Sequence, residues 1–557
     1  MAEIEKHREK LWFSVLVNIL LLLILLLVFR PVYETNDDMG MANMVNGAKG
    51  VYDPHLVFSH YLLGLFLSCL YRMTDRITWY PVIQYCVLFA SFTAVTYVWN
   101  RRRKRAADVW ICALFLVVFS YEGYIRLQFT KTAGIVSAAG MFLLFYAITQ
   151  ERIQRKAFLA GMLLACAGFM YRMNQFFAEG LLMTGIGVYQ LLRLRELPRG
   201  SRLKRLLLYI GTFGFLVAVV LGLHRYEQHV YGSSQEWQEY LTYNKLRGKL
   251  YDFGFPGYKE NKEAYREMGI SSAAYNMYRS WNHMDTERFT TELMTQIREL
   301  QPEKSIDGAF IREFFGVFPV SFFTISVFYC FLLLVLYWLF WGRHGGAEII
   351  TVVYESVIVL FLYFYLYYVG RYLHNRVDVG IWFAVSLIML WIYREERHRF
   401  HSRTGMVLFL GAVLLYQRSW KTDWRISNSD AVMQRERAVI GAIHNDSEHL
   451  YLTKVKTVSF ANSYGVFDRI PFGMAMNTYS LGGWASKSPV YSSVLSQYGV
   501  INPFRDMVGN EKVYLIDDDI DATMDYIHKY YDKDAEAVEA FELFPYQVYQ
   551  IQAGTDS

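Results

Sequence analysis

The chain has 557 residues, of which 54% are hydrophobic and 17% aromatic, and its formal net charge is +5. The length exceeds one ordinary core, and the composition is too apolar for a soluble multidomain protein. The small net charge gives no reason to expect a nucleic-acid partner. The five cysteines lie in apolar segments without metal-binding spacing, so any domain outside a membrane is expected to fold without disulfides.

The first apolar segment, residues 11–29, is long enough to cross a bilayer. A spanning helix needs roughly 20 apolar residues, because the hydrocarbon core is about 30 Å thick. A charged start precedes this segment, but no small-residue cleavage site follows it. We therefore interpret it as an uncleaved first span, followed by an outer loop over residues 30–78.

Residues 55–71 look like a second span, but the distribution of basic residues argues against it. The segment is short and carries His55 and His60. If it crossed the membrane, the span at 79–99 would deliver the basic cluster 101–105 to the outside, whereas basic loops favour the cytoplasm. We therefore expect 55–71 to lie on the outer face as a juxtamembrane helix.

With this placement, every basic cluster lies on the cytoplasmic side. The N-terminus is then cytoplasmic, and the C-terminal region is extracytoplasmic. The expected fold is a multi-pass α-helical membrane protein of about eleven spans. The expected spans cover residues 11–29, 79–99, 107–122, 130–149, 157–173, 176–192, 206–223, 314–341, 348–369, 379–393 and 405–417.

Two further outer regions follow from this topology. Residues 224–313 are polar and rich in Tyr and Trp, which suits either sugar stacking or packing at the membrane interface. The tail, residues 418–557, alternates short β-like runs with helical patches, which is typical of a small α/β domain. We therefore divide the chain into a transmembrane domain, residues 1–417, and an extracytoplasmic α/β domain, residues 418–557.

The first outer loop carries the acidic stretch ETNDD (34–38), and the segment 60–81 follows it as a juxtamembrane helix leading into the second span. This order of features resembles the GT-C superfamily, the integral membrane glycosyltransferases that use polyprenyl-phosphate sugars. Protein mannosyltransferases and aminoarabinose transferases belong to it. The segments 126–140 and 168–180 resemble parts of uncharacterised bacterial members. The resemblance covers the architecture of nearly the whole chain.

The resemblance implies a cell-membrane glycosyltransferase that moves a sugar from a polyprenyl-phosphate donor to a cell-surface glycan or lipid acceptor. Such a transfer needs a base for the acceptor hydroxyl, and a carboxylate within hydrogen-bond reach can serve. A single displacement inverts the anomeric centre. Asp37 and Asp38 are the candidate catalytic residues, and Asp38 is the preferred base. The alternative is a solvated helix N-cap, with Thr35 or Asn36 sharing that role.

The leaving phosphate needs cations, which the sequence places near the outer face. The candidates for binding the donor phosphate are Arg126, Lys131, Arg172, Arg371 and Arg376. Arginine suits phosphate through its bidentate fork. The alternatives are a lipid-headgroup anchor, an internal ion pair or, for Lys131, snorkelling. No HExxH motif and no acidic cluster beyond the Asp pair occurs, so no cofactor is expected, and a divalent cation is left open.

Three other functions stay open. A transporter or flippase of lipid-linked sugars predicts paired broken spans with charges near the midplane, whereas here the charges gather at the outer rim. A polymerase or ligase of lipid-linked saccharides is kept open by the long outer region 224–313. The last alternative is a scaffolding membrane protein with the tail as a binding module.

Overall fold

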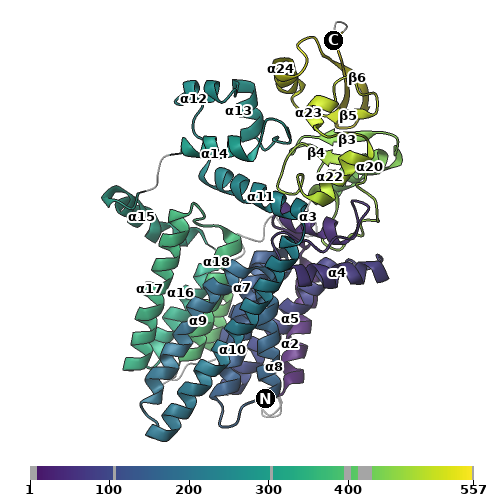
Figure 1. The fold of residues 1–557 in the computed structure, drawn as a ribbon. Coiled ribbons are helices and arrows are strands. Elements are labelled where there is room, and N and C mark those ends of the chain that lie inside the picture. Colours follow the sequence, from purple (N-terminus) through teal and green to yellow (C-terminus); the bar gives the residue numbers. More distant parts are fainter. Residues whose placement is uncertain are drawn as a thin grey trace.

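The computed structural model describes residues 9–103, 108–301, 305–325, 327–393, 403–411 and 429–554. Long helices form a bundle at one end of the molecule, and a smaller mixed part with the C-terminus lies at the other end (Figure 1). Six of the described helices are long and apolar enough to cross a membrane. They are α2 (Leu11–Val28), α5 (Trp79–Arg102), α7 (Phe129–Thr149), α10 (Arg199–Gly232), α17 (Gly346–Tyr368) and α18 (Asn375–Ile392). Their length and composition support a membrane protein.

Other bundle helices coincide with further expected spans. They are α6 (Asp108–Tyr124), α8 (Arg155–Tyr171), α9 (Met173–Leu194) and α16 (Phe328–Trp341). The last expected span, 405–417, lies partly outside the described residues, as does the boundary between the two expected domains at 417 and 418. Parts of the basic clusters 6–10, 101–105 and 394–403 also lie outside them.

The segment expected as one span over 314–341 is divided between two helices. α15 (Gly308–Ser321) contains Pro319, and the short 3-10 turn η1 (Phe322–Thr324) follows it before α16 begins at Phe328. Proline has no N–H for the helical ladder and its ring crowds the preceding turn, so helices tend to bend or end near it. The interpretation of 314–341 as one continuous helix is therefore wrong.

α7 is the central helix of the bundle, and 94% of its most apolar window is buried. It packs closely against α8 because small residues meet there. A Cβ added to Gly140 would lie 2.5 Å from the backbone nitrogen of Ala165, and one added to Gly161 would lie 3.0 Å from the Gly140 carbonyl oxygen. Small residues allow this approach, which supplies packing energy where lipid offers no hydrophobic driving force. The N-terminus of α7 is thereby held firmly in the bundle.

A two-residue ladder connects the first outer loop to the bundle. β1 (Val32–Tyr33) pairs in parallel with β2 (Arg126–Leu127), which lies just before α7. The next helix, α3 (Asn36–Val45), therefore begins close to the N-terminus of α7. This ladder is what brings residues of the acidic stretch to a helix that starts about ninety residues later in the chain.

The helix expected over 55–71 is α4 (Tyr61–Met73), which lies across the end of the bundle rather than along it (Figure 1). It begins later than expected because His60 caps its N-terminus, accepting the backbone N–H of Leu62 at 3.1 Å. Phe66 and Met73 are exposed on this helix. That orientation and this apolar surface agree with a helix lying at a membrane face.

Beyond the bundle, four helices of the second outer region pack with a five-stranded sheet of the tail. The helices are α11 (Gln235–Phe253), α12 (Lys262–Glu267), α13 (Ser272–Arg279) and α14 (Thr291–Glu299). The strands, in sheet order, are β4 (Thr478–Ser480), β3 (Leu450–Thr453), β5 (Val513–Ile516), β7 (Tyr546–Gln552) and β6 (Glu536–Leu543). β3 is parallel to β4 and β5, whereas β7 is antiparallel to β5 and β6. The tail helices are α20 (Ser429–Asn445), α21 (Phe460–Ser463), α22 (Pro489–Gln497), α23 (Pro503–Asp506) and α24 (Ile520–Tyr530).

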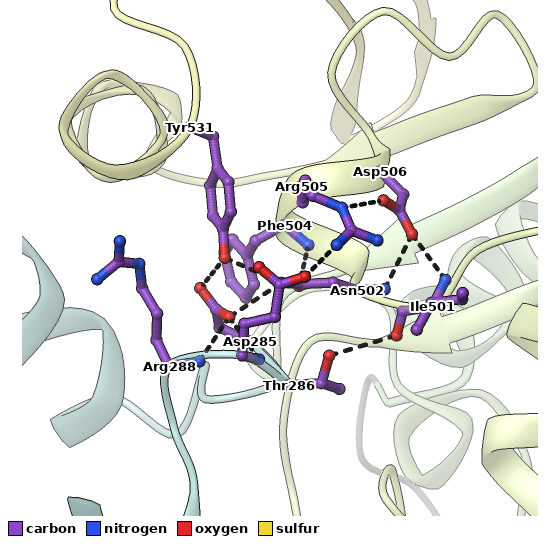
Figure 2. Close-up of polar contacts among 10 residues, drawn as sticks. Asp285, Thr286, Arg288, Ile501, Asn502, Phe504, Arg505, Asp506 and Tyr531 are labelled. Carbon is purple, nitrogen blue, oxygen red and sulfur yellow. Dashed lines mark hydrogen bonds and ion pairs between the residues drawn. The ribbon is translucent and has the colours of Figure 1, made fainter.

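The second outer region and the tail share one hydrophobic core, in which Tyr278 packs with Tyr526. A buried carboxylate joins the same two parts. Asp285 accepts hydrogen bonds from the hydroxyl of Tyr531 at 2.5 Å and from the amide of Asn502 at 3.0 Å (Figure 2). The unit beyond the bundle, expected to be extracytoplasmic, is therefore built from both regions, not from the tail alone.

Candidate functional site

Asp38 lies where the first outer loop meets the bundle. Its side chain is fully buried and accepts hydrogen bonds from the Tyr80 hydroxyl at 3.0 Å and from the backbone N–H of Phe129 at 3.1 Å. Phe129 is the first residue of α7, and the dipole at that helix terminus favours negative charge. Burial nevertheless raises the pKa of Asp38 to about 8, while the two hydrogen bonds act to lower it.

The acidic pair was also considered as a solvated cap of the helix that it begins, and the structure shows a different contact. α3 begins after Thr35, and the Thr35 side chain makes no capping hydrogen bond. Asp38 is buried, so it is not the solvated cap of its own helix. It instead satisfies an N–H at the start of α7, a helix far away in sequence.

Asp37 faces a different direction from Asp38, as consecutive helical residues do. Its side chain keeps 21% of its surface exposed, and its Oδ2 lies 3.6 Å from a guanidinium nitrogen of Arg376. Asp37 is therefore the carboxylate of the pair that a substrate can reach. This differs from the sequence-based preference for Asp38, because the relative burial of two adjacent acids depends on contacts distant in the sequence.

Arg172 lies between α8 and α9 in an extended backbone conformation. Its guanidinium lies over the rings of Phe58, at 5.3 Å, and Phe129, at 5.1 Å. The charges of Arg371 and Asp37 both act on it, which places it in one electrostatic cluster with the acidic stretch. The predicted cation at the end of the fifth expected span thus lies beside the candidate base.

Arg371 lies just before α18 and Arg376 lies at its start. Both belong to the same electrostatic cluster. Arg371 forms an ion pair with Asp252 of α11, so the second outer region reaches the site. Burial and the two neighbouring guanidinium groups lower the pKa of His374, which lies between them in the chain. The site therefore combines a surplus of positive charge with an imidazole whose protonation is disfavoured.

The two remaining predicted cations are placed differently. Lys131 is fully buried and forms ion pairs with both Glu34 and Glu122. Two carboxylates already compensate this ammonium, so its position matches the internal ion pair considered as an alternative. Arg126 belongs to the β2 strand and is partly buried. The structure thus gathers Asp37, Asp38, Arg172, Arg371 and Arg376, and separates Lys131 from them by its own acidic partners.

A cavity of about 350 Å³ opens beside Arg172, and its lining mixes polar side chains with apolar ones such as Phe169 and Leu241. We call it the polar cavity because it contains charged and polar groups. Asn174, His224 and Glu227 line it together with His60. The Nδ1 atom of His224 lies 4.0 Å from the Glu227 carboxylate and has no hydrogen-bond partner among the described residues. Sequence reasoning missed His224 and Glu227. Their signal was available, because both come directly after the span expected at 206–223.

An apolar cavity of about 550 Å³ lies between α7, α9 and α10. Phe145, Phe176 and Phe177 line it, and Phe177 is also exposed on the bundle surface. On α9, Phe176 and Phe177 come two and three residues after Asn174, which lines the polar cavity. The two cavities therefore follow one another along one helix, and together they suit a molecule with a polar head and an apolar chain.

The two histidines of the first outer loop have structural partners. His55 contacts the Asp53 carboxylate at 2.8 Å and stacks on Trp237 with ring centroids 4.3 Å apart. Within the part of the chain that the structure describes, no group of three or more His, Cys, Asp or Glu side chains could hold a metal ion.

Comparison of the chain with protein-family models, curated proteins and solved structures found no match. What the site can do must be inferred from its parts. They are an accessible carboxylate, a cluster of arginines, a polar cavity and an apolar cavity. This combination is complementary to an anionic head group on an apolar chain, with a carboxylate placed beside it.

Proposed function

We propose that the chain is an integral membrane glycosyltransferase that moves a sugar from a polyprenyl-phosphate donor to a cell-surface glycan or lipid acceptor. The observation that carries the proposal is the order of features at α9: the apolar cavity, then the polar cavity with Arg172, then Asp37 within electrostatic reach. A polyprenyl-phosphate sugar has its apolar chain, phosphate and sugar in the same order. The resemblance to the GT-C superfamily adds support.

In this proposal, the apolar cavity holds the part of the polyprenyl chain nearest the phosphate. Arg172 and Arg376 bind the phosphate, because guanidinium groups form paired, charge-assisted hydrogen bonds with its oxygens. Arg371 remains available to the phosphate only when its ion pair with Asp252 opens. Bringing Arg172 and Arg376 together costs repulsion, which an anionic head group would relieve.

Asp37 acts as the base. The acceptor hydroxyl oxygen attacks the anomeric carbon, its proton passes to the Asp37 carboxylate, and the bond from the anomeric carbon to the phosphate oxygen breaks. The electron pair of that bond leaves with polyprenyl phosphate, where the arginines stabilise it. One displacement inverts the anomeric centre. Asp38 positions α3 on α7 and does not touch the substrate in this scheme.

The topology belongs to the same proposal. We propose about eleven spans, with the N-terminus in the cytoplasm and the extracytoplasmic unit outside. The acidic stretch then lies at the outer face, where a lipid donor and an aqueous acceptor can meet. A cysteine introduced at Asp75 and one introduced at Arg152 should be labelled from opposite sides of the membrane. Labelling of both from one side would contradict this topology.

One observation favours the transporter alternative. Glu355 lies within α17, and both of its carboxylate oxygens are buried without a hydrogen-bond partner among the described residues. A buried carboxyl in a span is costly and commonly functional. A transporter predicts that Glu355→Gln abolishes movement of lipid-linked sugar across the bilayer, whereas the transferase proposal predicts normal sugar transfer in this variant.

The proposal is tested with the full-length protein in liposomes, a set of radiolabelled polyprenyl-phosphate sugars and a membrane glycan fraction as acceptor. We expect label from one donor to become covalently attached, one sugar at a time. Attachment of preassembled oligosaccharides would favour the polymerase or ligase alternative. Movement of label across the bilayer without covalent attachment would favour the transporter.

A further inference from the structure

A groove larger than either the polar cavity or the apolar cavity lies away from the bundle, within the proposed extracytoplasmic unit. Its volume is about 950 Å³, at the upper end of the roughly 300–1,000 Å³ typical of ligand sites. Residues of α11 and α22 make up most of its lining, and Tyr479 of β4 also lines it. The groove thus lies where the second outer region meets the tail, and neither region forms it alone.

The walls of the groove are rich in uncharged polar side chains. Hydroxyl groups dominate, and their protons are directed into the protein. The hydroxyl of Thr242 donates to the Gln238 carbonyl at 2.9 Å, that of Ser493 donates to Val490 at 2.8 Å, and that of Ser496 donates to Ser492 at 3.5 Å. The oxygen lone pairs of these groups remain for a ligand, so the walls mainly accept hydrogen bonds.

The charged side chains of the groove also mainly accept hydrogen bonds. Glu236 and Glu239 line it, and both carboxylates are acceptors. Among the described residues that line the groove, the one cation is Lys487. It lies 4.2 Å over the ring of Tyr243, and the charges of Glu239 and Glu292 act on it. The groove therefore disfavours an anionic ligand and favours one that carries many hydroxyl or N–H donors.

The groove is connected to the candidate site through a short series of packed side chains. Tyr240 lines the groove, and its hydroxyl donates to the carbonyl of Trp484 at 2.9 Å. The Trp484 ring packs on Phe58 with centroids 4.6 Å apart, and Phe58 lies under the Arg172 guanidinium. The groove and the Arg172 side of the site are therefore linked by one series of contacts.

We propose that the groove between α11 and α22 binds a glycan chain that is neutral or contains amino sugars. Many hydroxyl donors on a ligand match the acceptor-rich walls, and amino groups match the two glutamates. That this glycan is the acceptor of sugar transfer rests on the proposed function, whereas binding itself does not. If this glycan is the acceptor, sugar is transferred to a glycan chain without strong negative charge, and not to a lipid.

The test is binding of the full-length protein, in lipid nanodiscs, to an array of neutral, amino-sugar and acidic oligosaccharides, followed by titration calorimetry of the oligosaccharides that bind. Ser496→Trp fills the groove, and Gln497→Trp adds the same ring to the neighbouring exposed position, which does not line it. Thr242→Trp with Lys245→Trp as control repeats the comparison on α11. Thermal unfolding confirms that each variant is folded.

We expect the wild type to bind neutral or amino-sugar chains, with at least a tenfold loss of affinity in Ser496→Trp and Thr242→Trp and little change in the two controls. Asp37→Asn should bind the same chains as the wild type, whether or not it transfers sugar. The proposal is overturned if the wild type binds only acidic chains or none. It is also overturned if folded Ser496→Trp and Thr242→Trp bind as the wild type does. Failure of sugar transfer alone would contradict the proposed function and leave this binding result unaffected.

Discussion

The Asp38 carboxylate accepts the backbone N–H of Phe129 at 3.1 Å, across 91 residues of sequence. This contact fixes the acidic stretch against the N-terminus of the most buried helix of the bundle. It leaves Asp37, the preceding residue, on the accessible side with Arg376 beside it. One acid is therefore used to hold the loop in place, and the other is available for chemistry.

The raised pKa of Asp38 gives a prediction for stability against pH. Burial raises it from 3.8 to about 8, so between these values the folded protein holds a proton that the unfolded chain has lost. The contribution of Asp38 to the free energy of unfolding is therefore greatest at low pH. It falls as the pH rises towards 8, by at most about 1.4 kcal/mol per pH unit. Asp38→Asn removes this dependence.

The test measures the thermal midpoint of wild type and Asp38→Asn between pH 5 and pH 8. This range lies between the unfolded and the folded pKa of Asp38. The wild-type midpoint should fall with rising pH relative to that of the variant. Parallel curves would show that Asp38 is ionised in the folded protein, and that its hydrogen bonds from Tyr80 and Phe129 outweigh its burial.

The Asp285 network in Figure 2 predicts a large stability difference between two nearby acids. Asp285 is buried and accepts bonds from Tyr526, Tyr531 and Asn502. Asp285→Ala leaves these donors unsatisfied and should cost about 3 kcal/mol or more. Glu287→Ala removes an exposed ion pair and should cost at most about 1 kcal/mol.

Hydrogen exchange of β5 and α24, read by mass spectrometry, measures the local cost of each change. Faster exchange in Asp285→Ala than in Glu287→Ala is the expected result. Equal exchange in the two variants would mean that the shared core alone holds the second outer region to the tail.

Lys49 joins the first outer loop to the tail, and its contacts predict the cost of removing its side chain. Its buried ammonium donates to the carbonyls of Ala475 at 3.1 Å and Thr478 at 2.6 Å, and it lies 4.6 Å over the Tyr491 ring. Lys49→Ala leaves two carbonyls without this donor and should cost about 1–3 kcal/mol. Hydrogen exchange of the residues around β4 should rise in this variant and stay normal in Lys245→Ala, an exposed control on α11. Normal exchange in both would show that water replaces the ammonium at little cost.

The sequence predicted the elements whose signal is local. Apolar length predicted the six described helices that are long enough to cross a membrane, and short β-like runs predicted the strands β3, β5 and β7 of the tail. Pro319 was visible as a helix breaker within 314–341, but hydropathy alone joined the two helices on either side of it.

Contacts between distant segments could not be predicted in this way. No pattern near Asp38 indicates Phe129 as its partner, and none near Lys131 indicates that Glu34 would neutralise it. The core shared by the second outer region and the tail is also a product of tertiary packing. The accessible acid of the pair was therefore beyond sequence reasoning, although the pair itself was not.

The central claim is that Asp37 is the base for sugar transfer, and one assay tests it most directly. Membranes carrying wild type, Asp37→Asn or Asp75→Asn are compared for transfer from radiolabelled polyprenyl-phosphate sugars, with protein level and thermal midpoint measured in parallel. Asp75 is an acid of the same outer loop whose partner is Arg469, outside the site. We predict that folded Asp37→Asn loses transfer by about a hundredfold or more while Asp75→Asn stays near wild type. Near-normal transfer by folded Asp37→Asn would contradict the account.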